Sequence, residues 1–322
     1  MPKAIVVGKT GGPDVLEYTD VSVAEPGEGE LLVDVVAAGV NFIDTYQRSG
    51  LYPRNLPFIA GVEGAGTVAA VGRGVSGVRV GDRVAWAMTP GSYAEQAVIP
   101  ASSAVPVPDE ADIELAAAVL LQGLTAHYLV TSVYPVRQGD VILVHAAAGG
   151  VGLLLTQLVR SRGGRVIATA STREKAELAK GAGAETVLGY DDFAPQVREI
   201  TAGEGVAAVY DGVGKTTFDG SLDSLRVRGT LALFGASSGP VPPVDPQRLN
   251  SAGSVFLTRP NLANFIATRD ELEWRAGELF DALSSGDLTV HIGGKYSLAE
   301  ARQAHTDLEA RKTTGKLLLR CS

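Results

Sequence analysis

The sequence predicts an α/β protein with a doubly wound parallel sheet and a second, β-rich domain. From about Ile113 onward, short apolar strands alternate with stretches of helical pattern, which is typical of a parallel sheet covered by helices. Before about Pro108, short β-rich runs follow one another between glycine and proline turns, as in a compact barrel or sandwich. The length of 322 residues also suits two domains.

The individual elements follow from these patterns. In the β-rich part we expect strands at 4–7, 30–40, 66–72, 82–87 and 93–99, and one short helix at 43–49. A helix at 114–130 precedes parallel strands at 141–145, 165–170, 186–190, 207–212, 230–235 and 254–258, joined by helices within 151–162, 172–183, 193–203 and 216–228. A helix at 269–286, an extended run at 288–298, a helix at 299–311 and a strand at 316–320 then return to the first domain. The predicted domains are 1–122 with 263–322, and 123–262.

Composition excludes several classes of function. The formal net charge of -8 disfavours nucleic acid and anionic membrane surfaces as partners. The apolar stretch Val141 to Leu155, which we take as the longest, is too short to span a membrane, and the N-terminal apolar run is too short for a signal peptide. We therefore expect a cytoplasmic protein. Cys321 is the single cysteine, and the four histidines are scattered, so no metal site is expected.

The segment HAAAGGVG, residues 145–152, resembles a dinucleotide-binding loop that has alanine in place of its first glycine. Gly149 and Gly152 keep the spacing of the second and third glycines, which allow close approach of a diphosphate and close packing of helix on strand. Ala147 stands at the first position, which need only tolerate a tight turn. The backbone N–H groups from Gly150 to Leu153, Val151 included, would face the diphosphate.

The end of the second strand indicates which dinucleotide binds. An NAD-binding domain carries an acidic residue there, whereas this chain has no acid at the strand end and continues with Ser171, Arg173 and Lys175. These side chains could bind a 2'-phosphate through charge-assisted hydrogen bonds, which favours NADPH. The alternative is that Arg173 and Lys175 belong only to the solvated first turn of a helix.

The chain resembles the quinone oxidoreductase/zeta-crystallin branch of the medium-chain dehydrogenase/reductase superfamily. The resemblance rests on motifs that run in order over nearly the whole length: GVNFIDTYQRSGLYP (39–53), GVEGAGTVAAVG (61–72), GDRVAW (81–86), GDVILVHAAAGGVGLLLTQLVR (139–160), VYDGVG (209–214), LFGASSG (233–239) and LTRPNL (257–262).

This resemblance implies a GroES-like, β-rich catalytic domain and a Rossmann domain, with NADPH in a cleft between them and a homodimer joined along the Rossmann sheet edge at Ser254 to Thr258. It assigns the 2'-phosphate to Lys175, Tyr190 and Arg311, and the diphosphate to the backbone from Gly149 to Val151. The substrate side falls on Asn41, Tyr46 and Tyr52, and the nicotinamide side on Phe234, Gly235 and Ser237.

Zinc-dependent members of the superfamily have cysteine and histidine ligands at positions that correspond here to Asn41, Val62 and Gln122. None of these side chains is a usual zinc ligand, so we expect a zinc-free enzyme. An acceptor reduced without a metal must itself be electrophilic, which favours a quinone; whether electrons pass singly or as a hydride stays open.

Several side chains have two possible roles. Asn41 could bind the nicotinamide ribose or the substrate carbonyl, and Tyr46 or Tyr52 could donate to a developing oxyanion, or all three could serve only turn and packing roles. Glu63 is expected to be a buried structural acid, and Asp211 either caps its loop or contacts the cofactor. The rival functions are NADPH-dependent reduction of enones or other activated alkenes and, in a different class, nucleotide-modulated RNA binding or a crystallin-like role.

Overall fold

The computed structural model describes residues 1–321 and divides into two compact units. The first unit comprises residues 1–122, 266–285 and those from 290 onward, and the second comprises 123–265 with 286–289. The chain therefore returns to the first unit three residues later than the sequence suggested, and it makes an unforeseen short excursion at 286–289. Ser322, which ends the predicted first domain, lies outside the described residues.

The second unit is built on a six-stranded parallel sheet. Its strands are β9 (Val141–Val144), β10 (Arg165–Thr169), β11 (Thr186–Leu188), β12 (Val206–Asp211), β13 (Leu225–Leu233) and β14 (Phe256–Thr258). The order across the sheet is β11-β10-β9-β12-β13-β14, and every neighbouring pair is parallel. After β9, the chain adds β10 and β11 on one side of it and then β12, β13 and β14 on the other side. This order confirms the doubly wound sheet.

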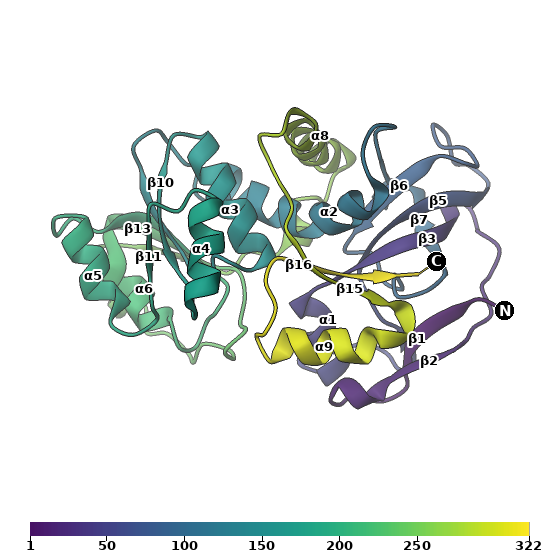
Figure 1. The fold of residues 1–322 in the computed structure, drawn as a ribbon, viewed down its shortest axis with the longest axis horizontal. Coiled ribbons are helices and arrows are strands. Elements are labelled where there is room, and N and C mark those ends of the chain that lie inside the picture. Colours follow the sequence, from purple (N-terminus) through teal and green to yellow (C-terminus); the bar gives the residue numbers. More distant parts are fainter. Residues whose placement is uncertain (322) are drawn as a thin grey trace. The chain divides into compact units, whose positions relative to one another are not determined.

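Helices cover both faces of this sheet (Figure 1). The helices are α3 (Gly150–Ser161), α4 (Arg173–Gly181), α5 (Phe193–Ile200), α6 (Phe218–Ser224) and the short α7 (Gln247–Ser251). Helices α3 and α4 contact each other and the strands β9 to β11, while α5 and α6 contact each other and α6 packs on β12 and β13. Apolar residues of α5 and α6, such as Val197 and Leu222, pack with Leu143 of β9 in one buried cluster.

The first unit contains two mainly antiparallel sheets. The smaller one has the order β2-β1-β4, and the larger one has the order β15-β16-β3-β5-β6-β8, with β7 also paired to β3. The strands are β1 (Lys3–Val7), β2 (Leu16–Asp20), β3 (Glu30–Val40), β4 (Phe58–Ile59), β5 (Glu63–Val71), β6 (Arg83–Ala87), β7 (Gln96–Pro100), β8 (Val105–Pro106), β15 (Ile292–Ser297) and β16 (Lys316–Arg320). The only parallel pair among them is β15 with β16.

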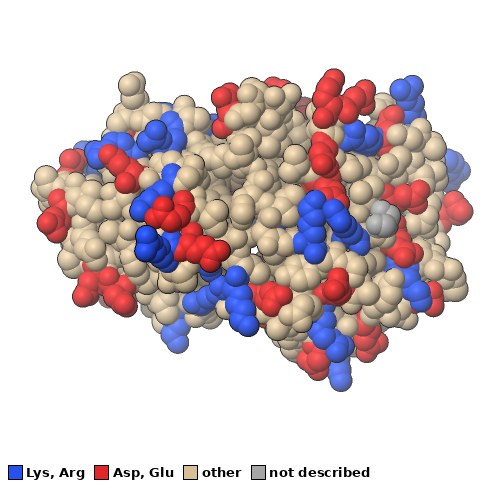
Figure 2. Space-filling view, in the orientation of Figure 1, with Lys and Arg blue, Asp and Glu red and all other residues tan. Residues whose placement is uncertain are grey.

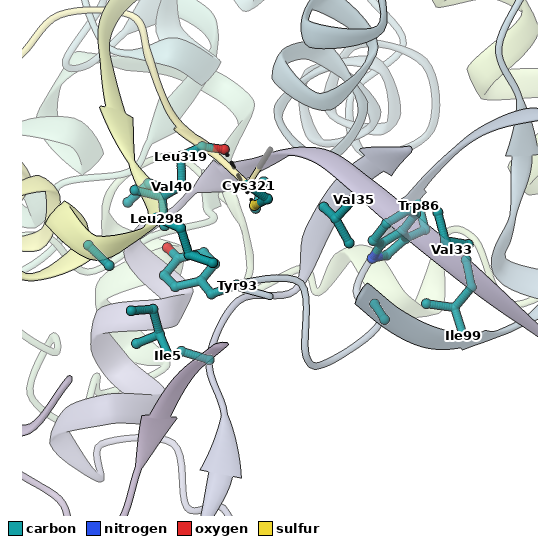
Figure 3. Packing of buried hydrophobic residues seen from close by; sticks show 14 of the residues in the cluster. Ile5, Val33, Val35, Val40, Trp86, Tyr93, Ile99, Leu298, Leu319 and Cys321 are labelled. Carbon is teal, nitrogen blue, oxygen red and sulfur yellow. Dashed lines mark hydrogen bonds between the residues drawn. The ribbon is translucent and has the colours of Figure 1, made fainter. Parts of the chain in front are cut away.

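The C-terminal segment completes this unit, as the sequence predicted. Strand β16 pairs with β3, so that Leu317 lies opposite Val40. Helices α1 (Phe42–Ser49), α8 (Arg269–Ser285) and α9 (Ala301–Glu309) belong to the same unit, and α9 contacts α1. Side chains from both ends of the chain share one core, where Leu319 and Cys321 pack with Ile5, Tyr93 and Trp86 (Figure 3).

One helical stretch, residues 113–133, is long and apolar enough to cross a membrane by length and composition alone. Helix α2 (Ile113–Tyr128) and the helical turn Leu129–Val133 together contain 21 residues, so this stretch is longer than the one at 141–155 considered above, and 18 consecutive residues within it have a mean hydropathy of 1.5. Within the structure, however, 83% of these 18 consecutive residues are buried. A core helix of a globular protein has these same properties.

Candidate functional site

The loop between β9 and α3 lies at the point where the strand order of the second unit reverses. Strands β10 and β12 flank β9 on opposite sides, so the connections that follow β9 and β12 leave the sheet in different directions. Open α/β sheets bind ligands at the carboxyl ends of their strands at this point. Residues 145–152 occupy this position.

The tight turn in this loop falls on Ala146 rather than on Ala147, the position to which the sequence analysis assigned it. Ala146 has φ of 50°, in the left-handed region that residues with a Cβ seldom adopt. Two hydrogen bonds hold it: its N–H donates to the Tyr190 hydroxyl at 3.1 Å, and the N–H of Ala147 donates to the Thr169 carbonyl at 3.1 Å. The loop conformation therefore depends on the last residue of β10 and on a residue that follows β11.

The two glycines of the loop have different surroundings. Gly149 is the residue before the first turn of α3, and a Cβ on it would lie 3.2 Å from the Ala146 carbonyl oxygen. A Cβ on Gly152 would lie only 2.4 Å from the same oxygen. Gly152 is therefore required for packing of α3 against the loop. The N–H of Leu153 already donates to the Gly149 carbonyl, so the donors left at the helix start are those of Gly150, Val151 and Gly152.

The segment after β10 presents cations at the start of α4. Ser171 and Arg173 are exposed and Lys175 is half-buried. Thr172 caps the helix, since its hydroxyl accepts a hydrogen bond from the Lys175 N–H at 3.2 Å. Because cations at a helix N-terminus oppose the helix dipole, an anionic ligand would rationalise Arg173 and Lys175.

The loops after β12 and β13 are joined closely to each other. A Cβ on Gly235 would lie 2.4 Å from the Gly212 carbonyl oxygen, and the Ser237 N–H donates to that same oxygen at 3.2 Å. Phe234 donates its N–H to the Asp211 carbonyl at 2.9 Å. Phe234, Gly235 and Ser237, predicted for the nicotinamide side, thus share one backbone-bonded turn.

Asp211 caps its loop, which is one of the two roles considered for it. Its side chain is fully buried. One carboxylate oxygen accepts the N–H groups of Val213 and Gly214 at 2.8 and 2.9 Å, and the other accepts the hydroxyls of Thr217 and Ser221 at 2.7 and 2.8 Å. Each carboxylate oxygen therefore accepts two hydrogen bonds from the protein itself.

In the first unit, Tyr46 and Tyr52 form an aromatic pair at the end of α1. Their ring centroids are 5.3 Å apart in an edge-to-face arrangement, and the Tyr52 N–H donates to the Tyr46 carbonyl at 3.0 Å. Tyr46 is half-buried, while Tyr52 is 39% exposed. The pair offers two phenol groups beside an apolar ring surface.

Asn41, by contrast, is buried and engaged within the protein. Its amide nitrogen donates to Glu63 at 2.8 Å and to the Gly39 carbonyl at 3.2 Å, and its amide oxygen accepts from Lys316 at 2.9 Å. Gln122 also donates to this oxygen, at 3.4 Å. Glu63 is fully buried and ion-paired with Lys316, in agreement with its expected structural role.

These residues do not fit a zinc ion. The amides of Asn41 and Gln122, which stand at positions where zinc-dependent members of the superfamily have ligands, meet each other; Val62 is aliphatic, and the Lys316 ammonium already places a positive charge beside Asn41. Zinc prefers thiolate and imidazole ligands. Among residues 1–321, no group of three or more His, Cys, Asp or Glu side chains could hold a metal.

A second buried network was missed by the sequence analysis. Asp44 accepts the Asn41 N–H and the Tyr93 hydroxyl, both at 2.9 Å; the Tyr93 hydroxyl lies 3.1 Å from His305, and His305 lies 3.2 Å from Arg48. Burial raises the pKa of Asp44 to about 7 and lowers that of His305 to about 3. No local signal links Tyr93 and His305 to Asp44 and Arg48 of α1, because the three segments are distant in the chain.

Arg311, the remaining predicted contact, lies after α9 in the first unit. It is exposed and has φ of 56°.

Comparisons with known proteins agree with this architecture. The family model described as "Alcohol dehydrogenase GroES-like domain" matches residues 27–109, and the model described as "Zinc-binding dehydrogenase" matches residues 150–279. A quinone oxidoreductase of Pseudomonas aeruginosa is 47% identical, and a 2-haloacrylate reductase of a Burkholderia species is 40% identical; each alignment covers 99% of both chains.

Two solved structures superpose closely on this chain. A mycobacterial protein complexed with NADPH is 60% identical with a TM-score of 0.97, and the Escherichia coli quinone oxidoreductase complexed with NADPH is 43% identical with a TM-score of 0.97. Each match covers 99% of both chains.

Proposed function

This chain belongs to the quinone oxidoreductases of the medium-chain dehydrogenase/reductase superfamily, and we propose that it reduces quinones with NADPH. The observation that carries the proposal is the full-length similarity to a quinone oxidoreductase solved with NADPH, together with a loop at 145–152 whose geometry suits a diphosphate. When bound, NADPH would supply the two reducing electrons, either singly or as a hydride.

The residues of the second unit fit this cofactor. The three N–H groups at the start of α3 and the helix dipole favour the diphosphate. Lys175, Arg173 and Ser171, with Tyr190 at the loop, are the groups proposed for the 2'-phosphate, and Arg311 is proposed as a further contact. Phe234, Gly235 and Ser237 are proposed to line the nicotinamide side, because their turn is held rigidly by the backbone of Asp211 and Gly212.

We propose that the quinone binds near Tyr46 and Tyr52. A phenol hydroxyl can donate a hydrogen bond to the quinone oxygen as negative charge develops on it. Asn41 has all its amide groups engaged, so we assign it a positioning role: it orients Glu63 and Lys316 and begins the helix that carries Tyr46. No step requires a metal, because a quinone is electrophilic enough to be reduced without a Lewis acid.

The test is steady-state oxidation of NADPH and NADH across 1,4-benzoquinone and 9,10-phenanthrenequinone. We expect quinone-dependent turnover with NADPH and a kcat/KM at least tenfold lower with NADH. Turnover with neither quinone, or an equal preference for NADH, would contradict the proposal.

A second candidate is the reduction of activated alkenes with the same cofactor. The observation in its favour is the 40% identity to a 2-haloacrylate reductase over the whole length. Short enones and 2-chloroacrylate assayed beside the quinones separate the two, since the proposed enzyme has the higher kcat/KM for quinones. RNA binding is less favoured: basic and acidic side chains are interspersed on the face shown in Figure 2, where no extended basic patch is seen. A gel shift with AU-rich RNA, with and without NADPH, tests it.

We further propose a cytoplasmic homodimer that joins along β14. This strand is at the edge of the parallel sheet, and Phe256 on it is 61% exposed beside a surface that includes Val227, which is 68% exposed. An unpaired edge strand with exposed apolar side chains favours pairing with a second copy. Phe256→Glu is expected to convert the dimer to monomers, as measured by sedimentation velocity. A variant that remains dimeric would contradict an interface along β14.

A further inference from the structure

A chain of four buried polar side chains runs beneath the carboxyl ends of the central strands in the second unit. His145 follows β9, Thr169 ends β10, Asp211 ends β12, and Ser221 lies on α6; none is more than 1% exposed. The His145 Nδ1 atom lies 2.9 Å from the Thr169 hydroxyl, and its Nε2 atom lies 3.0 Å from the Ser221 hydroxyl. The Ser221 hydroxyl is in turn 2.8 Å from Asp211.

The contacts fix the direction of every hydrogen bond in the chain. The Asp211 carboxylate can only accept, so the Ser221 hydroxyl donates to it and must accept from His145. Nε2 therefore carries the proton, and Nδ1 accepts from the Thr169 hydroxyl. Burial lowers the pKa of His145, which agrees with a neutral ring. A neutral imidazole is a donor on one side and an acceptor on the other, as this position requires.

Three of the four members also lie at the start of a loop of the candidate site. His145 leads directly into Ala146, the residue with positive φ, and the Thr169 carbonyl accepts the N–H of Ala147. Asp211 holds the backbone of Val213 and Gly214. The hydrogen-bonded chain therefore joins three loops: the one before α3, the one before α4, and the one after β12.

Two aromatic rings hold the imidazole in place. Phe193 meets His145 edge-to-face at a centroid distance of 4.9 Å, and Tyr190 lies nearly parallel to it at 6.2 Å. Tyr190 also accepts the Ala146 N–H, so the same ring that contacts His145 supports the turn.

We propose that His145, through Thr169, Ser221 and Asp211, is a positioning residue that keeps the three loops in the arrangement that binds the dinucleotide. This inference rests on the proposed function, because it concerns the same cofactor. None of the four side chains needs to touch the cofactor. Preformed loops lose less freedom on binding, so breaking the chain should weaken binding of the dinucleotide more than it slows the reaction.

The test compares variants that break the chain with a matched control. His145→Phe keeps a ring beside Phe193 and Tyr190 but removes both nitrogens, and Thr169→Val and Ser221→Ala each remove one hydroxyl. Ser224→Ala is the control: Ser224 is also buried and also on α6, but its hydroxyl donates to the Gly220 carbonyl, outside the chain. For each protein, the Kd of NADPH and NADH, kcat, KM and Tm are measured.

We expect His145→Phe to raise the Kd of both dinucleotides at least tenfold, with kcat within about threefold of the wild type. Thr169→Val and Ser221→Ala should each raise the Kd at least threefold, and the double variant His145→Phe/Thr169→Val should bind no more weakly than His145→Phe, because the chain is already broken. Ser224→Ala should lower Tm without changing the Kd.

The inference is overturned if Thr169→Val, Ser221→Ala and His145→Phe all lower Tm as Ser224→Ala does while the Kd of NADPH stays within twofold. Valine has nearly the same shape as threonine, so the Thr169→Val variant is expected to fold. Its Kd for NADPH therefore still tests the inference if His145→Phe does not fold. Failure of wild-type protein to bind NADPH in calorimetry is a different result and contradicts the proposed function itself.

Discussion

Lys316 and Glu63 form an ion pair in which neither side chain is exposed to solvent. They open β16 and β5, which both pair with β3, so the ion pair bridges β3 at Gly39. A Cβ on Gly39 would lie 2.2 Å from a Glu63 oxygen and 2.7 Å from the Lys316 Cε. The ion pair therefore requires glycine at position 39.

Removal of Lys316 should destabilise the protein strongly. Lys316→Met leaves the Glu63 carboxylate buried without a countercharge, and we expect the free energy of unfolding to fall by about 3–5 kcal/mol. Urea unfolding at pH 7 measures it. Lys316→Met/Glu63→Gln carries no unpaired charge and should recover much of the loss, whereas a double variant as unstable as the single one would show that the charge is not the cause.

Gly152→Ala should displace α3 from its loop. The added Cβ would lie 2.4 Å from the Ala146 carbonyl oxygen, and overpacking of this kind costs about 1–3 kcal/mol. We expect a lower Tm and at least a tenfold increase in the Kd of NADPH. Gly181→Ala is the control, because Gly181 is in the same unit and a Cβ added there would have no other atom within 4 Å. This variant should change neither Tm nor the Kd of NADPH by much. Equal behaviour of the two variants would refute the packing argument.

Lys175→Ala should change cofactor preference rather than dinucleotide binding in general. Loss of one charge-assisted contact to the 2'-phosphate corresponds to about 1.5–3 kcal/mol, so KM for NADPH should rise at least tenfold and KM for NADH should stay constant. Lys180→Ala on the same helix, where Lys180 pairs with Glu177, is the control. An unchanged KM for NADPH in Lys175→Ala would exclude its role.

The two tyrosines are tested together. If either phenol donates to the developing oxyanion, Tyr46→Phe/Tyr52→Phe should lower kcat several-fold while the Kd of NADPH stays constant. Full activity in the double variant would leave both residues with packing roles alone.

Stability should respond to pH through Asp44 and His305 with opposite signs. The pKa of Asp44 is raised from 3.8 to about 7, so the folded state binds more protons than the unfolded chain between these values, and stability falls as pH rises. The pKa of His305 is lowered from 6.5 to about 3, so the unfolded chain binds more protons in that window, and stability rises with pH. Between about pH 4 and pH 6.5 the two effects should nearly cancel.

Variants separate the two contributions. Relative to the wild type, Asp44→Asn should make the free energy of unfolding rise more steeply with pH, by about 1.4 kcal/mol per unit, and His305→Phe should make it fall by a similar slope. Denaturant titrations at pH 4.5, 5.5 and 6.5 measure the slopes. Parallel slopes in all three proteins would contradict this assignment.

Much of the fold could be predicted because its signals are local. Apolar strands that alternate with amphipathic helices predicted the parallel sheet, and the spacing of Gly149 and Gly152 predicted a candidate ligand loop at the carboxyl end of its first strand. The same local motifs carried the resemblance that the comparisons confirm. Even so, the positive φ fell on Ala146 instead of Ala147, because a turn adjusts to the hydrogen bonds that Tyr190 and Thr169 offer it.

The amino-acid sequence by itself thus determined the strands of the parallel sheet, the longer helices, the glycine loop and the family of this protein, since periodicity and motif spacing depend only on neighbours in the chain, whereas the short elements β2, β4, β8 and α7 were not foreseen. The tertiary structure alone decided which buried polar groups meet. Asn41 contacts Lys316 across 275 positions, and His145 contacts Ser221 across 76. Which residues become such partners depends on which strands lie side by side and on the need to pair every buried charge. A local sequence pattern contains neither kind of information.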